Sequence, residues 1–255
     1  MLGFKEYIAE RAISFGEKNF GQIIFLSGGA GSGKGFVIDN MLQVNKFKVF
    51  DVDEFKRLAI QSKKIVAKFP ELQGLNLKNP KDVGKLHAFM KEKGFIEKAK
   101  DNLFANNNKL HNIIFDMTGK SPSDFSKILP RLIELGYETN DINLVWVLTN
   151  INIALARNQK RSRVVDPDIL LQTHKGAAKT MASFILDKKM PKEIGGDVHV
   201  VLNRPELTIF YKKSPNAKVT TDSKGKKTTK AVIKDFKSVQ VKRKGKTINT
   251  TERDI

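Results

Sequence analysis

The 255-residue sequence contains no cysteine and only four histidines, which are scattered along the chain. The absence of cysteine excludes disulfide bonds, cysteine zinc sites and a thiol nucleophile. Long apolar runs are also missing, since no uncharged stretch reaches the ~18–20 residues that a membrane helix needs. The first residues show no basic segment followed by an apolar one, so no secretory signal is expected. We therefore expect a soluble, cytoplasmic protein without membrane contact.

Acidic residues are few compared with basic ones. The chain has 46 Lys and Arg against 27 Asp and Glu, a net charge of +19. Residues 212–255 carry 14 of the basic and 4 of the acidic side chains, which is about half of the excess. One interpretation is a solvated tail or a lysine-rich hairpin that keeps the protein soluble. The other is a surface that binds an anionic partner, with nucleic acid phosphates as the first candidate.

Short apolar runs alternate with segments of helical periodicity up to about residue 205. The runs predict strands over 23–26, 49–52, 113–115, 144–148 and 198–202, and the periodic segments predict helices over 4–19, 36–42, 54–69, 84–105, 122–135, 151–163 and 168–189. This alternation is typical of βαβ units, so we predict an α/β domain over residues 1–205 with a parallel sheet of about five strands. Residues 206–255 are predicted to form a basic extension, either a β-hairpin or partly disordered.

A glycine-rich segment follows the first strand directly and precedes a helix. It reads Gly28-Gly29-Ala30-Gly31-Ser32-Gly33-Lys34-Gly35. Glycines allow backbone N–H groups to surround phosphate oxygens, and the helix N-terminus adds its dipole. Lys34 supplies a positive charge for the β- and γ-phosphates. The segment predicts a P-loop NTPase-type fold that binds ATP through Gly29, Ala30, Gly31, Ser32, Gly33, Lys34, Gly35 and Phe36.

The P-loop departs from the usual pattern at one position. Gly35 follows the lysine, where most such loops have Ser or Thr to bind Mg²⁺, and the next residue is Phe36. Without this hydroxyl, Mg²⁺ would be held by waters, phosphates and carboxylates, which suits an ion that keeps much of its hydration shell. We still expect ATP and Mg²⁺ as cofactors.

Carboxylates follow the second and third predicted strands, where the crevice of an open α/β sheet lies. Asp53 is the candidate general base for an attacking hydroxyl, and Lys56 or Arg57 is placed to hold an anionic group of the acceptor. The alternative is that Asp53 caps a helix and the charges are solvated. Asp116 is the candidate ligand of Mg²⁺, directly or through water. Acceptor binding with Thr118 and a purely structural turn are its alternatives.

Arginines follow the fourth predicted strand. Arg157 and Arg161 stand four residues apart, a spacing that puts both guanidinium groups on one face of a helix. Over a transferring phosphoryl group they would neutralise charge in the transition state. The alternative is a solvated basic helix.

Together these segments resemble the kinase superfamily that holds polynucleotide 5′-kinases and zeta-toxin-type kinases. The stretch from Asp51 to Arg57 is similar to the acidic-then-basic segment of both groups, which implies that Asp53 is the base and that Lys56 contacts substrate. The arginine segment looks most like the polynucleotide-kinase lid, whose arginines clamp the nucleotide. The run from Asp116 to Lys120 looks more like the zeta-toxin segment, with an acid, a Thr-Gly and a basic residue. We include Thr118 and Lys120 in the predicted acceptor site.

The resemblance implies transfer of the ATP γ-phosphate to a hydroxyl. The candidate acceptors are a nucleic-acid 5′-hydroxyl, a nucleotide or nucleotide-sugar, and a small metabolite. A second hypothesis is a P-loop ATPase or nucleotide-binding module that acts with a nucleic-acid or protein assembly and has no acceptor. A third is a degenerate P-loop domain that only binds, for which the missing hydroxyl after Lys34 is the argument. The sequence leaves the oligomeric state open.

Overall fold

The computed structural model describes residues 12–15, 20–44, 47–104, 110–210, 219–221, 227–229, 233–243 and 246–247. Most of the predicted helix over 4–19 lies outside these residues. Within the described part of that segment the helix prediction is wrong, because Ile13 forms a β-bridge with Leu42. The lysine-rich stretch 223–230 also lies largely outside, with only residues 227–229 described.

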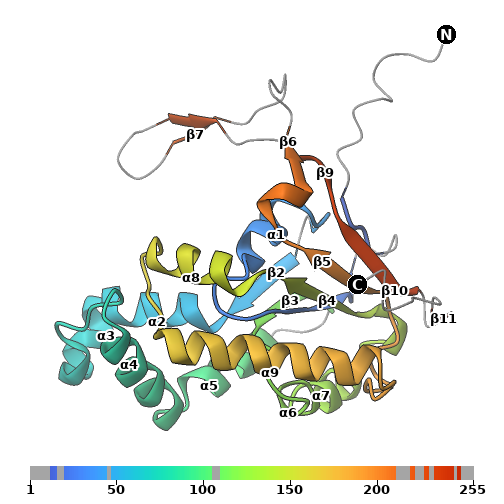
Figure 1. Ribbon diagram of the computed structural model, residues 1–255. Helices are drawn as coiled ribbons and strands as arrows, with labels where there is room; N and C mark the ends of the chain where they lie inside the picture. Colours follow the sequence, from blue (N-terminus) through green and yellow to red (C-terminus); the bar gives the residue numbers. More distant parts are fainter. Residues whose placement is uncertain are drawn as a thin grey trace.

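Seven strands of the described chain form one sheet, in the order β11-β10-β5-β4-β1-β3-β2 (Figure 1). They are β1 Ile23–Ser27, β2 Phe47–Asp51, β3 Asn112–Met117, β4 Ile142–Leu148, β5 Val198–Leu202, β10 Ser238–Arg243 and β11 Lys246–Thr247. The five neighbouring strands β5, β4, β1, β3 and β2 are parallel and coincide with the five predicted ones. The expected α/β class is therefore confirmed.

Two strands from the C-terminal segment enlarge the sheet beyond the expected five. β10 pairs antiparallel with β5, and β11 pairs with β10. Further along this segment, β6 (Thr208–Phe210) pairs with β9 (Ile233–Phe236), and β7 (Val219–Thr221) pairs with β8 (Lys227–Thr229). The described part of residues 206–255 thus contains antiparallel strands, two of which extend the central sheet.

Helices cover both faces of the sheet (Figure 1). They are α1 Lys34–Asn40, α2 Val52–Gln61, α3 Lys63–Lys68, α4 Pro80–Glu92, α5 Phe95–Phe104, α6 Ser123–Ser126, α7 Leu129–Glu134, α8 Ile151–Gln159 and α9 Pro167–Ile185. Successive strand residues point to opposite faces. Accordingly, Ile23 and Phe25 of β1 pack with α7 and α9, whereas Ile24 and Leu26 pack with α1. Burial on both faces explains why the strands are continuous apolar runs.

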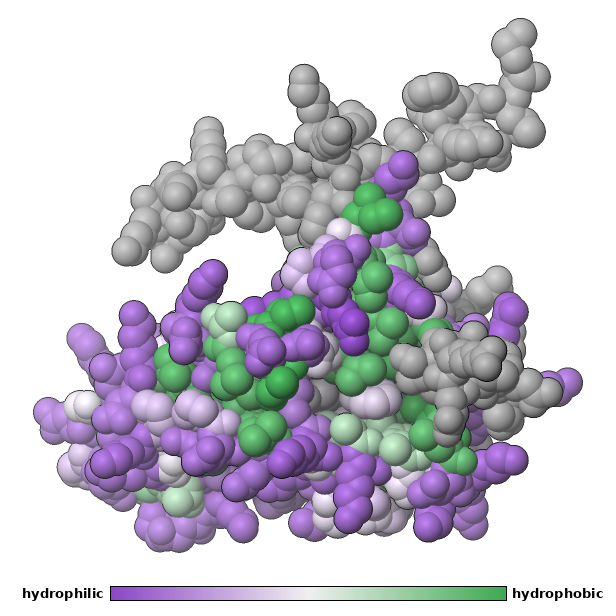
Figure 2. Space-filling view, viewed as in Figure 1, coloured by the Kyte–Doolittle hydropathy of each residue, from purple (hydrophilic) through white to green (hydrophobic). Residues whose placement is uncertain are grey.

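The helices α2 to α5 gather at one end of the molecule (Figure 1). They share a small core of their own, in which Phe69, Phe89 and Phe95 contact one another and Leu72 and Leu86 are buried. Figure 2 shows that the outer surface over these helices is mostly hydrophilic. None of the helices in the described ranges is long and apolar enough to cross a membrane.

Candidate active site

The P-loop runs from the end of β1 to the start of α1. Gly31 and Gly33 have positive φ angles of 76° and 87°, which other residues rarely adopt. A Cβ atom at Gly31 would lie 2.6 Å from the carbonyl oxygen of Ala154, and one at Gly33 would collide with the amide of Asn203. These glycines are therefore required both for the backbone conformation and for the close packing of the loop against its neighbours.

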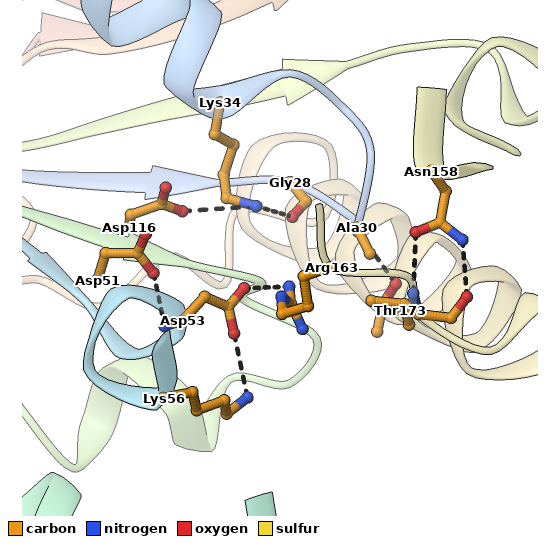
Figure 3. A network of polar contacts seen from close by, with 11 residues as sticks. Gly28, Ala30, Lys34, Asp51, Asp53, Lys56, Asp116, Asn158, Arg163 and Thr173 are labelled. Carbon is orange, nitrogen blue, oxygen red and sulfur yellow. Dashed lines mark hydrogen bonds and ion pairs between the residues drawn. The ribbon is translucent and has the colours of Figure 1, made fainter. Parts of the chain in front are cut away.

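Lys34 connects the P-loop to the end of β3 (Figure 3). Its Nζ donates a hydrogen bond to the Gly28 carbonyl at 2.9 Å and lies 3.5 Å from Oδ1 of Asp116. Burial raises the pKa of Asp116, and Lys34 opposes this shift. The expected carboxylate of the third strand and the P-loop lysine are thus neighbours.

Two aspartates lie where β2 passes into α2, Asp51 as the last residue of the strand and Asp53 in the first turn of the helix. Asp51 caps α2 by accepting a hydrogen bond from the Asp53 backbone N–H at 2.8 Å, and it stands beside Asp116 in the parallel register. Burial raises the pKa of Asp51 as well. The capping role that was the alternative for Asp53 therefore belongs to Asp51, which leaves the side chain of Asp53 available for other contacts.

Asp53 is bound by two cations (Figure 3). Lys56 Nζ lies 3.0 Å from one carboxylate oxygen, and the guanidinium of Arg163 pairs with the other. Burial alone would raise the pKa of Asp53, but Lys56 and Arg163 together lower it below its ordinary value. The Asp53 side chain keeps 36% of its surface exposed, whereas those of Lys56 and Arg163 keep 8% and 12%. The charged form of Asp53 is therefore favoured, and its carboxylate stays partly exposed.

The arginine segment differs from the expectation. α8 ends at Gln159, so the prediction that Arg157 and Arg161 share one helix face is wrong, and Arg161 lies exposed beyond the helix. Arg157 donates to the carbonyl of Ser32 in the P-loop at 3.4 Å. The second arginine that reaches the site is Arg163, two residues beyond the predicted one. Sequence spacing missed it because the chain leaves the helical path before residue 160.

The loop that carries Arg163 is fixed at both ends. Asn158, which is buried, donates to the Val165 carbonyl at 2.7 Å and accepts from the Val165 N–H at 3.0 Å. The Val164 N–H donates to the carbonyl of Leu77, at 2.9 Å, in the segment before α4. Arg163 therefore reaches Asp53 from a loop whose backbone is held in place.

The remaining predicted positions are placed as follows. The Thr118 carbonyl accepts hydrogen bonds from Ser27 Oγ at 2.9 Å and from the Gly28 N–H at 3.2 Å, so this segment adjoins the base of the P-loop. The backbone of Lys120 packs against α9. Arg57 pairs with Glu54 on the exposed surface of α2 and does not join the ion pairs at Asp53.

Three residues contact the P-loop although the sequence analysis did not identify them. Asn203 Nδ2 donates to the Ser32 carbonyl at 2.7 Å, from the position directly after β5. Thr173 and His174 of α9 both bond to Ala30. A polar residue at the end of a predicted strand was an available signal for Asn203. Nothing in the local pattern of α9 distinguishes the other two.

The carboxylates fit the requirements of Mg²⁺. Asp51 and Asp116 offer hard oxygen ligands beside Lys34, and burial raises the pKa of both although Lys34 opposes the shift. A Cβ at Gly35 would meet nothing within 4 Å, so the structure leaves room for a side chain at the position of the usual hydroxyl. In the part of the chain that the structure describes, no group of three His, Cys, Asp or Glu side chains could hold a metal on its own. Phosphate oxygens and waters would have to complete the coordination.

Comparison with known proteins assigns the chain to one family. The family model of the zeta toxin matches residues 17–214, which is well over half of the chain. A search of curated proteins finds no match.

Several solved structures are similar in fold. A structure from the PezAT chromosomal toxin-antitoxin system of Streptococcus pneumoniae aligns with a TM-score of 0.48 at 13% identity, covering 78% of this chain and 74% of that one. Deoxyadenosine kinase from M. mycoides with bound dATP aligns with a TM-score of 0.37 at 17% identity, covering 74% and 93%. A structure of AvrRxo1-ORF1 with AvrRxo1-ORF2 aligns with a TM-score of 0.39 at 12% identity, covering 89% of this chain and 60% of that one.

Proposed function

The chain belongs to the zeta toxin family, and we propose that it is a kinase that transfers the γ-phosphate of ATP to a hydroxyl group of an acceptor. The P-loop kinase fold of the family supports ATP-dependent phosphotransfer as the general chemistry. The observation that carries the proposal is the position of Asp53. Its partly exposed carboxylate, whose pKa is lowered by Lys56 and Arg163, lies beyond the carboxyl end of β2, next to the strand end that carries Asp116 and its partner Lys34.

In this proposal Lys34 and those backbone amides of residues 29–36 that are not already bonded within the protein bind the β- and γ-phosphates, whereas the Ala30 N–H is bound by Thr173. Asp116, with Asp51 beside it, would hold Mg²⁺ directly or through water, and the ion supplies neutralisation of phosphate charge. Asp53 accepts the proton of the acceptor hydroxyl while that oxygen bonds to the γ-phosphorus. The bond between the γ-phosphorus and the bridging oxygen breaks, and ADP leaves with the bonding electrons.

The arginines stabilise the charge that develops in this step. Arg157 already contacts the P-loop, and Arg163 is at hydrogen-bonding distance of Asp53. We assign to Arg157 and Arg163 the lid role that was predicted for Arg157 and Arg161. Arg161 lies nearby in the same loop and adds positive charge without a contact of its own to the carboxylate.

The acceptor in this proposal is anionic. Lys56 and Arg163 are two largely buried cations that share the single carboxylate of Asp53, so the pair leaves an excess positive charge. Lys56, Lys120 and Thr118 are the proposed acceptor contacts, with Arg57 at the outer rim. A nucleic-acid 5′-hydroxyl and a nucleotide or nucleotide-sugar both satisfy this requirement, because each carries phosphate near its hydroxyl groups.

A second candidate is a P-loop ATPase or nucleotide-binding module without an acceptor. Gly35 favours it, because the loop lacks the hydroxyl that most P-loop enzymes use for Mg²⁺. Asp53 separates the two candidates. Replacing its carboxylate removes the base for an acceptor hydroxyl, whereas hydrolysis without a bound acceptor need not depend on it.

The test is incubation with γ-labelled ATP and Mg²⁺, in parallel with a 5′-hydroxyl oligonucleotide, a set of nucleotides and a set of nucleotide-sugars. We expect label on one acceptor class, lost in Asp53→Asn and Lys34→Ala and retained in the control Asp187→Asn, whose side chain is exposed near the end of α9. Label that appears only as free phosphate, equally in Asp53→Asn, supports the hydrolase instead. Absence of any turnover and of any ATP binding overturns both candidates.

A further inference from the structure

Helix α9 contacts the P-loop through two consecutive residues. The Ala30 N–H donates to Thr173 Oγ1 at 3.2 Å, and His174 Nε2 lies 2.7 Å from the Ala30 carbonyl oxygen. The Thr173 hydroxyl donates its own proton to the Leu170 carbonyl at 2.7 Å, which leaves its oxygen free to accept from Ala30. Both backbone groups of one P-loop residue are therefore bound by a helix more than 140 residues away in sequence (Figure 3 shows Thr173 beside Ala30).

The tautomer of His174 follows from this contact. A carbonyl oxygen only accepts hydrogen bonds, so Nε2 of His174 must carry the proton. Burial lowers the pKa of His174 and the nearby charge of Lys34 lowers it further, although the bond to Ala30 opposes both. The ring also covers Gly29 so closely that a Cβ atom there would collide with it. His174 is thus a neutral donor that packs on the P-loop and bonds to it.

The composition of the P-loop explains why such a contact matters. Four of the six residues 28–33 are glycine, and glycine has the largest freedom to lose when a backbone becomes ordered. Ala30 lies in the middle of this glycine-rich run. A loop that is already held in one shape binds its ligand more tightly, because less conformational entropy is lost on binding.

The helix that holds Ala30 also borders the other parts of the site. Its N-terminus directly follows the loop of Arg163. This loop ends at Val165, which is bound by Asn158, and the next residue, Asp166, caps α9. One turn beyond Thr173, the same helix packs closely on the backbone of Lys120. α9 is therefore a rigid support against which the P-loop can be fixed relative to the rest of the crevice.

We propose that Thr173 and His174 are positioning residues that hold the P-loop in the shape that binds nucleotide. This role rests on the proposed function, since it concerns the ATP site of that reaction. Neither side chain needs to touch the phosphates, because each acts on them through the backbone of Ala30. The effect should therefore fall on ATP affinity and leave the acceptor site unchanged.

The test compares two variants at each position. His174→Phe keeps a ring over Gly29 but removes the donor, and His174→Gln keeps an N–H donor at a similar distance from the backbone. Thr173→Val removes the acceptor oxygen, and Thr173→Ser keeps it. One buried neutral hydrogen bond is worth about threefold to tenfold in a binding constant. We expect a rise of this size in the Kd of a non-hydrolysable ATP analogue and in KM for ATP in His174→Phe and Thr173→Val. The conservative variants should recover most of the loss, with KM for the acceptor unchanged in all four.

His111→Phe is the matched control, since His111 precedes β3 at the amino-terminal ends of the parallel strands, whereas the P-loop follows the carboxyl end of β1. Equal ATP affinity in wild type and in both His174→Phe and Thr173→Val overturns the proposal, as does an equal loss in the Phe and Gln variants. A protein that binds no nucleotide overturns the proposed function, and with it the role of Thr173 and His174. The hydrogen bond itself is tested without nucleotide: ¹⁵N shifts of the His174 ring should report the Nε2–H tautomer, and an Nδ1–H tautomer would contradict the geometry.

Discussion

The guanidinium of Arg163 pairs with the carboxylate of Asp53, although 110 residues separate them in the sequence. The pair joins the loop between α8 and α9 to the start of α2. It lies at the carboxyl edge of the sheet, where Lys34 and Asp116 also meet. The proposed base and the proposed lid arginine are therefore in direct contact in the structure.

Replacement of Arg163 tests this contact. In Arg163→Gln we expect kcat to fall roughly 100-fold, because one charged donor to the transferring phosphoryl group is lost. Arg163 also helps to lower the pKa of Asp53, so its loss should raise that pKa and move the acid limb of the kcat profile to higher pH. The matched control is Arg161→Gln, in which an exposed arginine outside the ion pair is removed. Equal effects of the two changes on kcat and on the acid limb would contradict the assignment.

Asn158→Ala should release the loop of Arg163. The change removes two hydrogen bonds and leaves the N–H and carbonyl of Val165 without the Asn158 side chain as their partner. We expect this to lower the free energy of unfolding by about 2–4 kcal/mol. We expect this loss in urea denaturation, together with a lower kcat at temperatures where the variant is folded. Asn152→Ala, on the exposed side of the same helix, should change neither quantity measurably. A stable Asn158→Ala variant with normal kcat would show that the position of the loop does not depend on the hydrogen bonds between Asn158 and Val165.

Gly35→Ser tests how the site manages without the usual hydroxyl. A Cβ at Gly35 meets nothing within 4 Å and the residue has a helical backbone, so the variant should fold and gain about 0.5 kcal/mol of helix propensity. The new hydroxyl would stand where most P-loops bind Mg²⁺. We expect a severalfold lower apparent KM for Mg²⁺ at fixed ATP. Gly33→Ala is the contrasting variant, since its positive φ and the contact with Asn203 exclude a side chain, and it should lose ATP binding.

His199 makes the stability of the protein depend on pH. It lies in β5 against Phe15, and its Nε2 is buried without a hydrogen-bond partner among the described residues. Burial lowers the pKa of His199 from 6.5 to about 4. Between these values the unfolded chain binds a proton that the folded protein does not, so stability is lost as the pH falls through this range.

The shift corresponds to a loss of about 3 kcal/mol between pH 7 and pH 4 that is due to this residue. In His199→Phe we expect the unfolding free energy to fall by about 3 kcal/mol less than in wild type between pH 7 and pH 4. Denaturant unfolding at several pH values measures this difference. Phe15→Leu keeps the histidine, so it should lower stability at every pH but retain the pH dependence. If the unfolding free energies of wild type and His199→Phe fall equally between pH 7 and pH 4, His199 is not the source of the pH dependence.

The sequence predicted well those features that depend on neighbouring residues. The five parallel strands were found because burial on both faces requires continuous apolar runs, and the P-loop was found because its glycines and Lys34 act within eight residues. Asp53 and Asp116 were singled out because strand ends face the crevice in any open α/β sheet. The end of α8 was misjudged because the charged run 157–163 fits helical spacing even where the backbone has already turned away.

The amino-acid sequence by itself therefore determined the class of the fold, the phosphate loop and the carboxylates of the crevice, since apolar periodicity and backbone freedom act over a few residues. Only the tertiary structure decided that β1 lies between β3 and β4, that β10 extends the sheet beside β5, that Arg163 and not Arg161 reaches Asp53, and that Thr173 and His174 hold Ala30. These contacts join residues more than a hundred positions apart or strands that are not consecutive. They depend on the order of the strands and the path of each crossover, which local preferences do not specify.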